Sequence, residues 1–158
     1  MIGQPTTSDP FQLVDEGASV TTRKVFTRMG ERLDLTAETL GRSIRLDAIM
    51  LESVTWQDPD ALADRGRSID RSDALAEPPA LTEAEREDPI TVSSEFAQAS
   101  VEKVEVDGRP LLAVEAPKLG YSIRLSAPAL AWLATQDHEL FTEWLETPFG
   151  PGADDHEH

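Results

Sequence analysis

The side chain best suited to acid–base chemistry is His138, because the other two histidines, His156 and His158, stand at the very end of the chain. A serine–histidine–aspartate triad would therefore have to use His138. Asp137 and Glu139 flank it at an expected helix start, which favours a solvated polar residue. The histidines thus give no candidate catalytic residue.

The acidic residues offer a second kind of chemistry. Hydrolysis by paired carboxylates needs two acids that face one cleft and have well-separated pKa values. The chain has 30 aspartates and glutamates, and no pair among them stands out by its spacing. The tail Asp154-Asp155-His156-Glu157-His158 carries metal-ligand types, but ordering a mobile tail costs entropy, so a solubilising role is favoured. No glycine-rich phosphate loop is present. The sequence predicts no catalytic residue, no cofactor and no metal, and therefore not an enzyme.

Four aromatic residues near the C-terminus are the candidate partner-binding residues. They are Trp132, Phe141, Trp144 and Phe149, on or next to an expected C-terminal helix. Tryptophan and phenylalanine are enriched in the cores of protein interfaces. The favoured alternative is that they pack this helix against a sheet.

The net charge of the chain indicates the salt environment in which the protein works. Its net charge is -16, with 14 basic residues and no cysteine. Such a surface repels itself in dilute salt, whereas molar salt shortens the Debye length to about 3 Å. Dispersed acid and scarce lysine resemble the proteome of a salt-accumulating haloarchaeon; the alternative is an acidic protein from a high-GC bacterium. Without cysteine there is no disulfide framework and no Cys-ligated zinc.

Charge and hydropathy also exclude some partners. The densest basic segment, Arg65-Gly66-Arg67, is too small for the basic stripe that direct nucleic-acid binding needs. The longest apolar stretch, Ala127–Ala134, is too short to span a bilayer. The N-terminus lacks the basic and apolar regions of a signal peptide. A cytoplasmic location is expected.

Composition divides the chain into five segments. We expect a flexible N-terminal arm over 1–17 and a first β-rich half over 18–63. An acidic, proline-containing linker or loop follows over 64–89. A second β-rich half with a C-terminal helix covers 90–149, and an acidic, histidine-containing tail covers 150–158.

Local patterns place the elements within the two halves. Alternation of apolar and polar residues predicts strands over 31–37 and 43–56, the latter including Ile49–Trp56. Asp107-Gly108 predicts a hairpin with a type I′ turn. Asp58 followed by Pro59 predicts a short helix.

The helical C-terminal region has its own start signals. Ser126 is the expected N-cap of a helix with Pro128 in its first turn. Asp137 is placed to cap a second helical piece after an interruption.

The chain also resembles itself. The segment Leu40–Ala48 aligns with Leu119–Ala127, 79 positions later, and only the third and eighth of the nine positions differ. One interpretation is a duplicated β-β-β-α unit whose two copies share a core. The other is that one strand-entry sequence arose twice in a sheet protein.

A family resemblance accompanies these patterns. The segments Gly30–Leu40 and Ser43–Ile49, followed by Val54, resemble the opening strands of pleckstrin-homology-like (PH-like) and GRAM-like domains. The resemblance covers about residues 18–147. It implies a β-roll closed by the helix that carries Trp132 and Trp144, and an adaptor role towards proteins or lipids. Cations between the first two strands are too few for a basic lipid-binding loop.

The sequence therefore predicts an α+β fold, mostly antiparallel β, with a C-terminal helix. It is either a PH-like roll or a duplicated β-β-β-α arrangement. The predicted function is a non-catalytic adaptor or regulatory module of a halophile that binds a protein partner, with a homodimer as a further possibility. The alternatives are an acidic, nucleic-acid-mimicking inhibitor of a DNA-binding protein and a small carboxylate-dependent enzyme.

Overall fold

Eight antiparallel strands form two four-stranded sheets, as a computed structural model that describes residues 7–72, 74, 81 and 84–146 shows. The first sheet has the order β1 (Phe11–Asp15), β2 (Ala18–Thr27), β3 (Gly30–Ala37), β4 (Arg42–Leu46). The second has the order β5 (Ile90–Ser93), β6 (Gln98–Val106), β7 (Arg109–Ala116), β8 (Tyr121–Ser126). The predicted α+β class with mostly antiparallel strands is confirmed.

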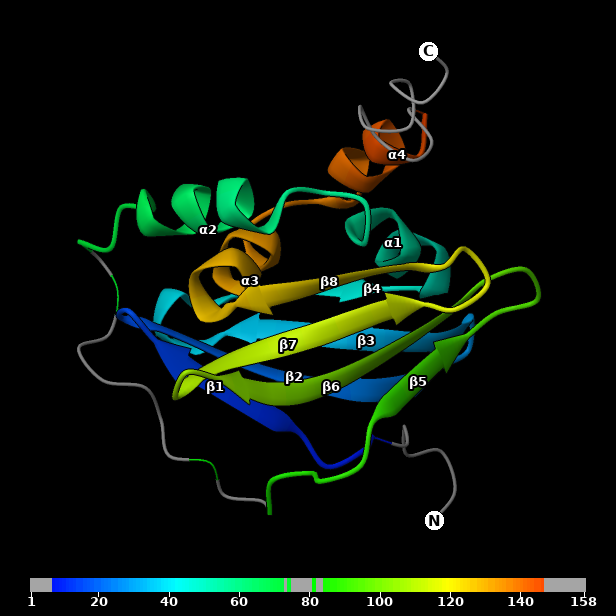
Figure 1. Cartoon of the computed structure of the whole chain (residues 1–158), viewed down its shortest axis with the longest axis horizontal. Coiled ribbons are helices and arrows are strands. Elements are labelled where there is room, and N and C mark those ends of the chain that lie inside the picture. The colour runs from blue at the N-terminus through cyan, green and yellow to red at the C-terminus, as the bar shows by residue number, and fades with distance from the viewer. Residues whose placement is uncertain (1–6, 73, 75–80, 82–83, 147–158) are drawn as a thin grey trace.

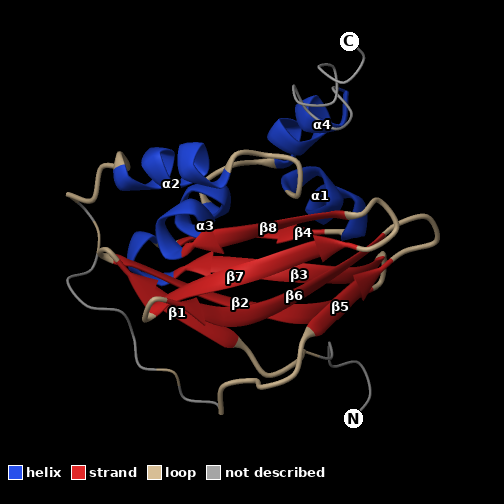
Figure 2. Cartoon of the chain, viewed as in Figure 1, coloured by secondary structure: helices blue, strands red, loops and turns tan. Residues whose placement is uncertain are grey.

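Helices follow each sheet in the chain. A 3-10 turn, η1 (Glu38–Leu40), precedes β4, and α1 (Ala48–Val54) and α2 (Pro59–Arg67) come after it. Two further helices, α3 (Ala127–Ala134) and α4 (His138–Glu146), come after β8, so the predicted C-terminal helix is confirmed. All four α-helices lie on one side of the strands (Figure 1, Figure 2).

The two halves of the chain have their elements at matching positions. Gly30 begins β3 and Arg109, 79 positions later, begins β7. Pro59 begins α2 and His138, again 79 positions later, begins α4. Each half thus consists of four strands and two α-helices. That is one strand and one helix more than the β-β-β-α unit that the duplication interpretation expected.

The helices of each half pack mainly on the other half. Helix α1 lies against β6 and β7, and α3 lies against β2 and β3. Helix α2 packs on α3, and α4 packs on α1. The exchange is reciprocal, so neither sheet is covered chiefly by the helices that follow it in the chain.

The two halves of the chain share a single hydrophobic core. A void of about 10 Å³ is lined only by apolar side chains, five from each half. They are Leu33, Leu35, Leu46, Leu51 and Val54 from the first half, and Leu112, Val114, Leu125, Leu130 and Leu133 from the second. Each residue of the first set has its counterpart in the second 79 positions later, so equivalent positions of the two halves meet.

Helix α1 stands where the sequence predicted a continued strand over Ile49–Trp56, and that prediction was wrong. The carboxylate of Asp47 accepts a hydrogen bond of 2.9 Å from the backbone N–H of Met50, which is an N-cap. The apolar Leu51 and Val54 are three positions apart and both are buried, so a helical period suits this stretch. The predicted cap at Ser126 is confirmed, since its hydroxyl accepts from the N–H of Ala129.

Two predicted segment boundaries also differ from the structure. Residues 11–15 were assigned to a flexible arm, but Phe11–Asp15 pairs with β2 as strand β1, because Phe11 and Leu13 are buried in the core. Helix α2 continues to Arg67, beyond the expected linker start at residue 64. Residues 1–6 and the tail over 150–158 lie outside the described residues.

Other local predictions hold. Asp107 and Gly108 have φ angles of 55° and 78°, and positive φ at both central residues is what a type I′ turn requires. Helix α2 begins at Pro59 with Asp58 as its N-cap, as predicted. Helix α4 starts after Asp137, whose carboxylate accepts from the N–H of Glu139 at 3.0 Å.

Candidate functional site

The candidate site is a groove between α2 and α4, which we call the tryptophan groove. It encloses about 440 Å³ and is lined by Trp56, Gln57, Asp58, Ala61, Leu62, Arg65 and Trp144. Ligand pockets commonly have volumes of about 300–1,000 Å³. Six of the seven lining residues come from the first half of the chain and one, Trp144, from the second.

Helix α2 forms one wall of the groove. Its N-cap and its small residues determine where it starts and how closely it packs. The carboxylate of Asp58 accepts from the N–H of Asp60 at 2.9 Å, which fixes the helix start beside the groove. Leu62 is buried and Arg65, three residues on, is exposed, so the helix presents an apolar side chain and a cation to the same region. Gly66 is buried against α3, and because it has no side chain the two helices can approach each other closely.

The opposite wall is an aromatic cluster. Phe141 is fully buried and meets the Trp144 ring edge-on at 5.4 Å between centroids. The Trp132 ring lies 6.5 Å from that of Trp144. The Arg65 guanidinium carbon sits 4.9 Å from the centroid of Trp132, a cation–π contact between α2 and α3. Phe141 therefore anchors α4, while half-buried Trp144 forms the groove wall.

The structure brings together three of the four predicted partner-binding residues. Trp132, Phe141 and Trp144 form the cluster just described, and Phe149 lies outside the described residues. Trp56 and Arg65 also lie at this place, and sequence reasoning did not include them among the partner-binding residues. One signal was available: Gln57-Asp58 recurs as Gln136-Asp137 at the spacing of the repeat, so the residues around both should occupy matching places.

Two matching contacts join the halves of the chain beside the groove. The Trp56 ring packs edge-on against Tyr121 of β8, with centroids 6.4 Å apart. At the matching place in the other half, an Arg42 side-chain N–H donates to the carbonyl of Thr135 at 2.8 Å. In each contact, the first residue of an edge strand (Arg42 of β4 or Tyr121 of β8) meets the residues that follow a helix of the opposite half, α3 or α1. The two contacts therefore join the halves next to the starts of α2 and α4.

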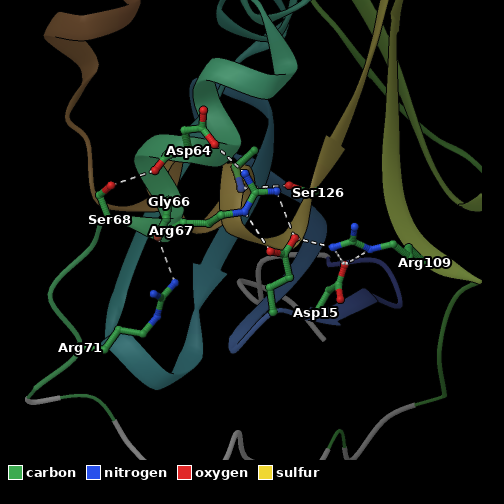
Figure 3. A network of polar contacts seen from close by, with 10 residues as sticks. Asp15, Asp64, Gly66, Arg67, Ser68, Arg71, Arg109 and Ser126 are labelled. Carbon is green, nitrogen blue, oxygen red and sulfur yellow. Dashed lines mark hydrogen bonds and ion pairs between the residues drawn. The ribbon is translucent and has the colours of Figure 1, made fainter.

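A second polar site, which we call the end cluster, consists of Asp15, Glu16, Asp64, Arg67 and Arg109. Arg67 pairs with Glu16 at 2.8 Å and with Asp64 at 2.6 Å. Arg109 pairs with Asp15 at 2.9 Å and also with Glu16. The arginines come from α2 and β7, and Figure 3 shows Arg67 and Arg109 directed at the acidic turn after β1. The cluster therefore ties the two halves together at one end of the molecule.

Titration in the end cluster follows from these pairs. The hydrogen bond from Arg67 lowers the pKa of Glu16 below its ordinary value, and the bond from Arg109 adds to this. The same bond with Glu16 raises the pKa of Arg67, and the bond with Asp15 raises that of Arg109. All these shifts stabilise charged forms, as expected of structural ion pairs.

His138 is exposed at the start of α4. Its Nε2 atom lies 2.9 Å from the backbone carbonyl oxygen of Arg45, which places the ring against β4. Among the described residues, no group of three or more histidines and acids is arranged to hold a metal ion. The acidic, histidine-containing tail lies outside that part of the chain.

The chain matches no known protein-family model, and no curated protein is significantly similar to it. No described helix is both long and apolar enough to cross a membrane.

Proposed function

We propose that the protein is a non-catalytic protein-interaction module that binds its partner in the tryptophan groove. One observation carries the proposal: all three tryptophans of the chain meet at this one place. Tryptophan and arginine dominate the binding energy of protein interfaces, where they sit in pockets at the centre of the contact. Trp56, Trp144 and Arg65 have those identities and that location.

The chemistry of the groove suits a protein segment with one apolar or aromatic anchor. Leu62 and the two indole rings supply apolar walls, while Gln57, Asp58 and Arg65 supply polar groups at the rim. An apolar centre with a polar rim is the usual anatomy of a protein interface. Arg65 already lies over Trp132, so its guanidinium is held in place and loses less freedom when a partner accepts a hydrogen bond from it.

We place this module in the cytoplasm of a salt-accumulating organism. The support is compositional: a net charge of -16, three lysines and no cysteine. High salt screens the repulsion among dispersed acids and leaves burial of apolar surface as the main source of affinity. A groove walled by tryptophan is suited to that condition.

The test is a comparison of captured partners at molar salt. Tagged wild-type protein, Trp144→Ala, Arg65→Ala and the control Arg124→Ala are incubated with native extract, and bound proteins are quantified by mass spectrometry. Arg124 is an exposed arginine of β8 outside the groove. One partner at near-equal stoichiometry with wild type and control, reduced at least tenfold with both groove variants, is the expected result. Equal capture by all four proteins contradicts the groove as the binding site.

Far-UV circular dichroism accompanies the capture. We expect the spectrum of Trp144→Ala to match that of the wild type, because Trp144 is only half-buried and Phe141 remains to anchor α4. A collapse of the spectrum would show that Trp144 holds the fold and would remove it from the binding site. Capture of a DNA-binding protein by all variants would favour the acidic decoy instead.

A further inference from the structure

We propose that the protein binds a small zwitterion, a free amino acid with an apolar side chain, in a pocket beside the end cluster. This pocket, which we call the end pocket, encloses about 300 Å³ between α2, β7 and β8. That volume lies at the lower end of the range of ligand pockets, which suits a ligand of this size. The end pocket shares no lining residue with the tryptophan groove, so the proposal does not rest on the proposed function.

The end cluster forms one wall of the end pocket, and its charges are already paired. Arg67 and Arg109 both donate to Oε2 of Glu16, so the two guanidinium groups meet on one carboxylate oxygen. Asp64 also binds Arg67 at 2.6 Å, and Asp15 also binds Arg109 (Figure 3). Two guanidinium groups held by three carboxylates form a fixed wall. A ligand is therefore recognised by the other charged residues of the pocket.

Three charged side chains of the end pocket have no such partner. Arg124 of β8, Asp60 of α2 and Asp107 of the turn between β6 and β7 all line the pocket. In the part of the chain that the structure describes, none of the three forms an ion pair. The two acids would repel a simple anion, whereas a ligand with both a carboxylate and an ammonium group can pair with charges of both signs.

The repeat indicates which group of the ligand Arg124 binds. The counterpart of Arg124, 79 positions earlier, is Arg45. Arg45 pairs at 3.3 Å with Asp34, the residue opposite it on the neighbouring strand. The residue opposite Arg124 is Ala113, so the second half keeps the arginine and lacks its carboxylate. The carboxylate of a ligand can take that place, because a planar guanidinium binds a carboxylate through two parallel hydrogen bonds.

The rest of the lining suits an apolar side chain. Pro59 and Ala63 line the end pocket from α2, and Val106 and Leu111 line it from β6 and β7. Val106 is 36% exposed, so a ligand can reach this apolar surface. Covering it with the ligand's side chain is favourable in molar salt as well, because salt screens charges but does not weaken the burial of apolar groups.

Isothermal titration calorimetry on the full chain at molar salt tests the proposal. The probes are L-valine and L-leucine. Each is compared with the alcohol that lacks its carboxylate, valinol or leucinol, and with the acid that lacks its amine, isovalerate or isocaproate. We expect at least one of the two amino acids to bind once per chain, and its two analogues to bind at least tenfold more weakly. No binding of either amino acid overturns the proposal. Equal binding of an acid without the amine overturns the choice of a zwitterion.

Variants of the two arginines then locate the binding. Arg124→Ala removes the partner of the ligand's carboxylate, and Ala113→Asp gives Arg124 the internal partner that Asp34 gives Arg45. Both changes should weaken binding at least tenfold, the loss expected when hydrogen bonds between charged groups are removed. The matched control is Arg45→Ala in the other half, which should bind like the wild type. Unchanged binding by Arg124→Ala overturns the proposal.

Arg124→Lys covers the case in which another variant does not fold. It keeps the positive charge of exposed Arg124 but loses the two parallel hydrogen bonds, so it should also bind more weakly than the wild type. Far-UV circular dichroism confirms the fold of each variant before titration. Trp144→Ala should bind the amino acid like the wild type, because Trp144 does not line the end pocket. A loss of binding in Trp144→Ala but not in the Arg124 variants would place the ligand in the tryptophan groove and overturn the proposal.

Discussion

Gly66 of α2 lies so close to α3 that a Cβ atom built on it would stand 1.8 Å from the carbonyl oxygen of Pro128. The approach joins the first half of the chain to the second, and backbone is the obstacle. In the other helix pair, α4 and α1, the positions equivalent to Gly66 and Pro128 are Leu145 and Ile49. Ile49 is 41% exposed. The junction between α2 and α3 is therefore the tighter of the two.

Gly66→Ala should destabilise the protein by about 3 kcal/mol, the upper range for overpacking a closely packed site. Helix propensity alone would change stability in the opposite direction, since alanine is the better helix former. Urea unfolding checks the prediction. Arg65→Ala, an exposed neighbour on the same helix, is the control and should change stability by less than about 1 kcal/mol. Equal stability of Gly66→Ala and wild type would show that the helices separate at little cost.

Thr22→Val should stabilise the protein by about 1 kcal/mol, because it removes a buried hydroxyl that has no partner. Thr22 is fully buried in β2, and its Oγ1 has no hydrogen-bond partner among the described residues. The control is Thr36→Val on neighbouring β3. The Thr36 hydroxyl donates to Asp34 at 2.6 Å, so its loss should bring no gain. Thermal unfolding of both variants decides the matter, and a lower melting temperature for Thr22→Val contradicts the assignment.

Stability should fall in acid through the end cluster. The pKa of Glu16 is lowered in the folded protein, so its contribution is present above the ordinary glutamate pKa of about 4.5 and is lost as pH falls through the lowered value. Protonation breaks the pairs with Arg67 and Arg109. Glu16→Gln should therefore flatten the loss of stability below about pH 4.5.

Denaturant unfolding at a series of pH values measures this effect. The control is Glu105→Gln, an exposed residue of β6 that forms no ion pair in the described part of the chain. The difference between Glu16→Gln and wild type should shrink in molar salt, because exposed pairs are screened there. Parallel pH profiles for wild type and Glu16→Gln would rule the cluster out as a source of acid sensitivity.

Much of the fold was predictable where a local signal decides the structure. The Asp107-Gly108 turn and the caps at Asp58, Ser126 and Asp137 all depend on residues within a few positions of each other. The prediction of a strand over Ile49–Trp56 was wrong because it followed the β-branched residues near the end of that segment. It did not consider Asp47, which the structure shows to be the N-cap of α1. The prediction of a flexible arm was wrong for Phe11–Asp15. The prolines and polar residues around this segment hid the fact that Phe11 and Leu13 are core residues.

The candidate site was harder to predict than the fold. Trp132 and Trp144 could be grouped from the sequence because both lie in the expected C-terminal helical region, which the structure divides into α3 and α4. Trp56 and Arg65 reach them only because α2 packs on α3 of the opposite half, and that packing is a long-range property. The repeated segment gave the positions that match between halves, but it did not show that the helices of each half pack mainly on the other.

Asp58→Ala should lower stability by about 1 kcal/mol and weaken partner binding at the tryptophan groove together. The carboxylate of Asp58 caps α2 by accepting from the N–H groups of Asp60 and Ala61, and the same residue lines the groove. Asp58→Ser separates the two roles, because serine caps nearly as well but removes the charge. Urea unfolding should show Asp58→Ser close to wild type, and partner capture then reports the carboxylate alone. If Asp58→Ala is as stable as wild type, the cap does not determine where α2 begins.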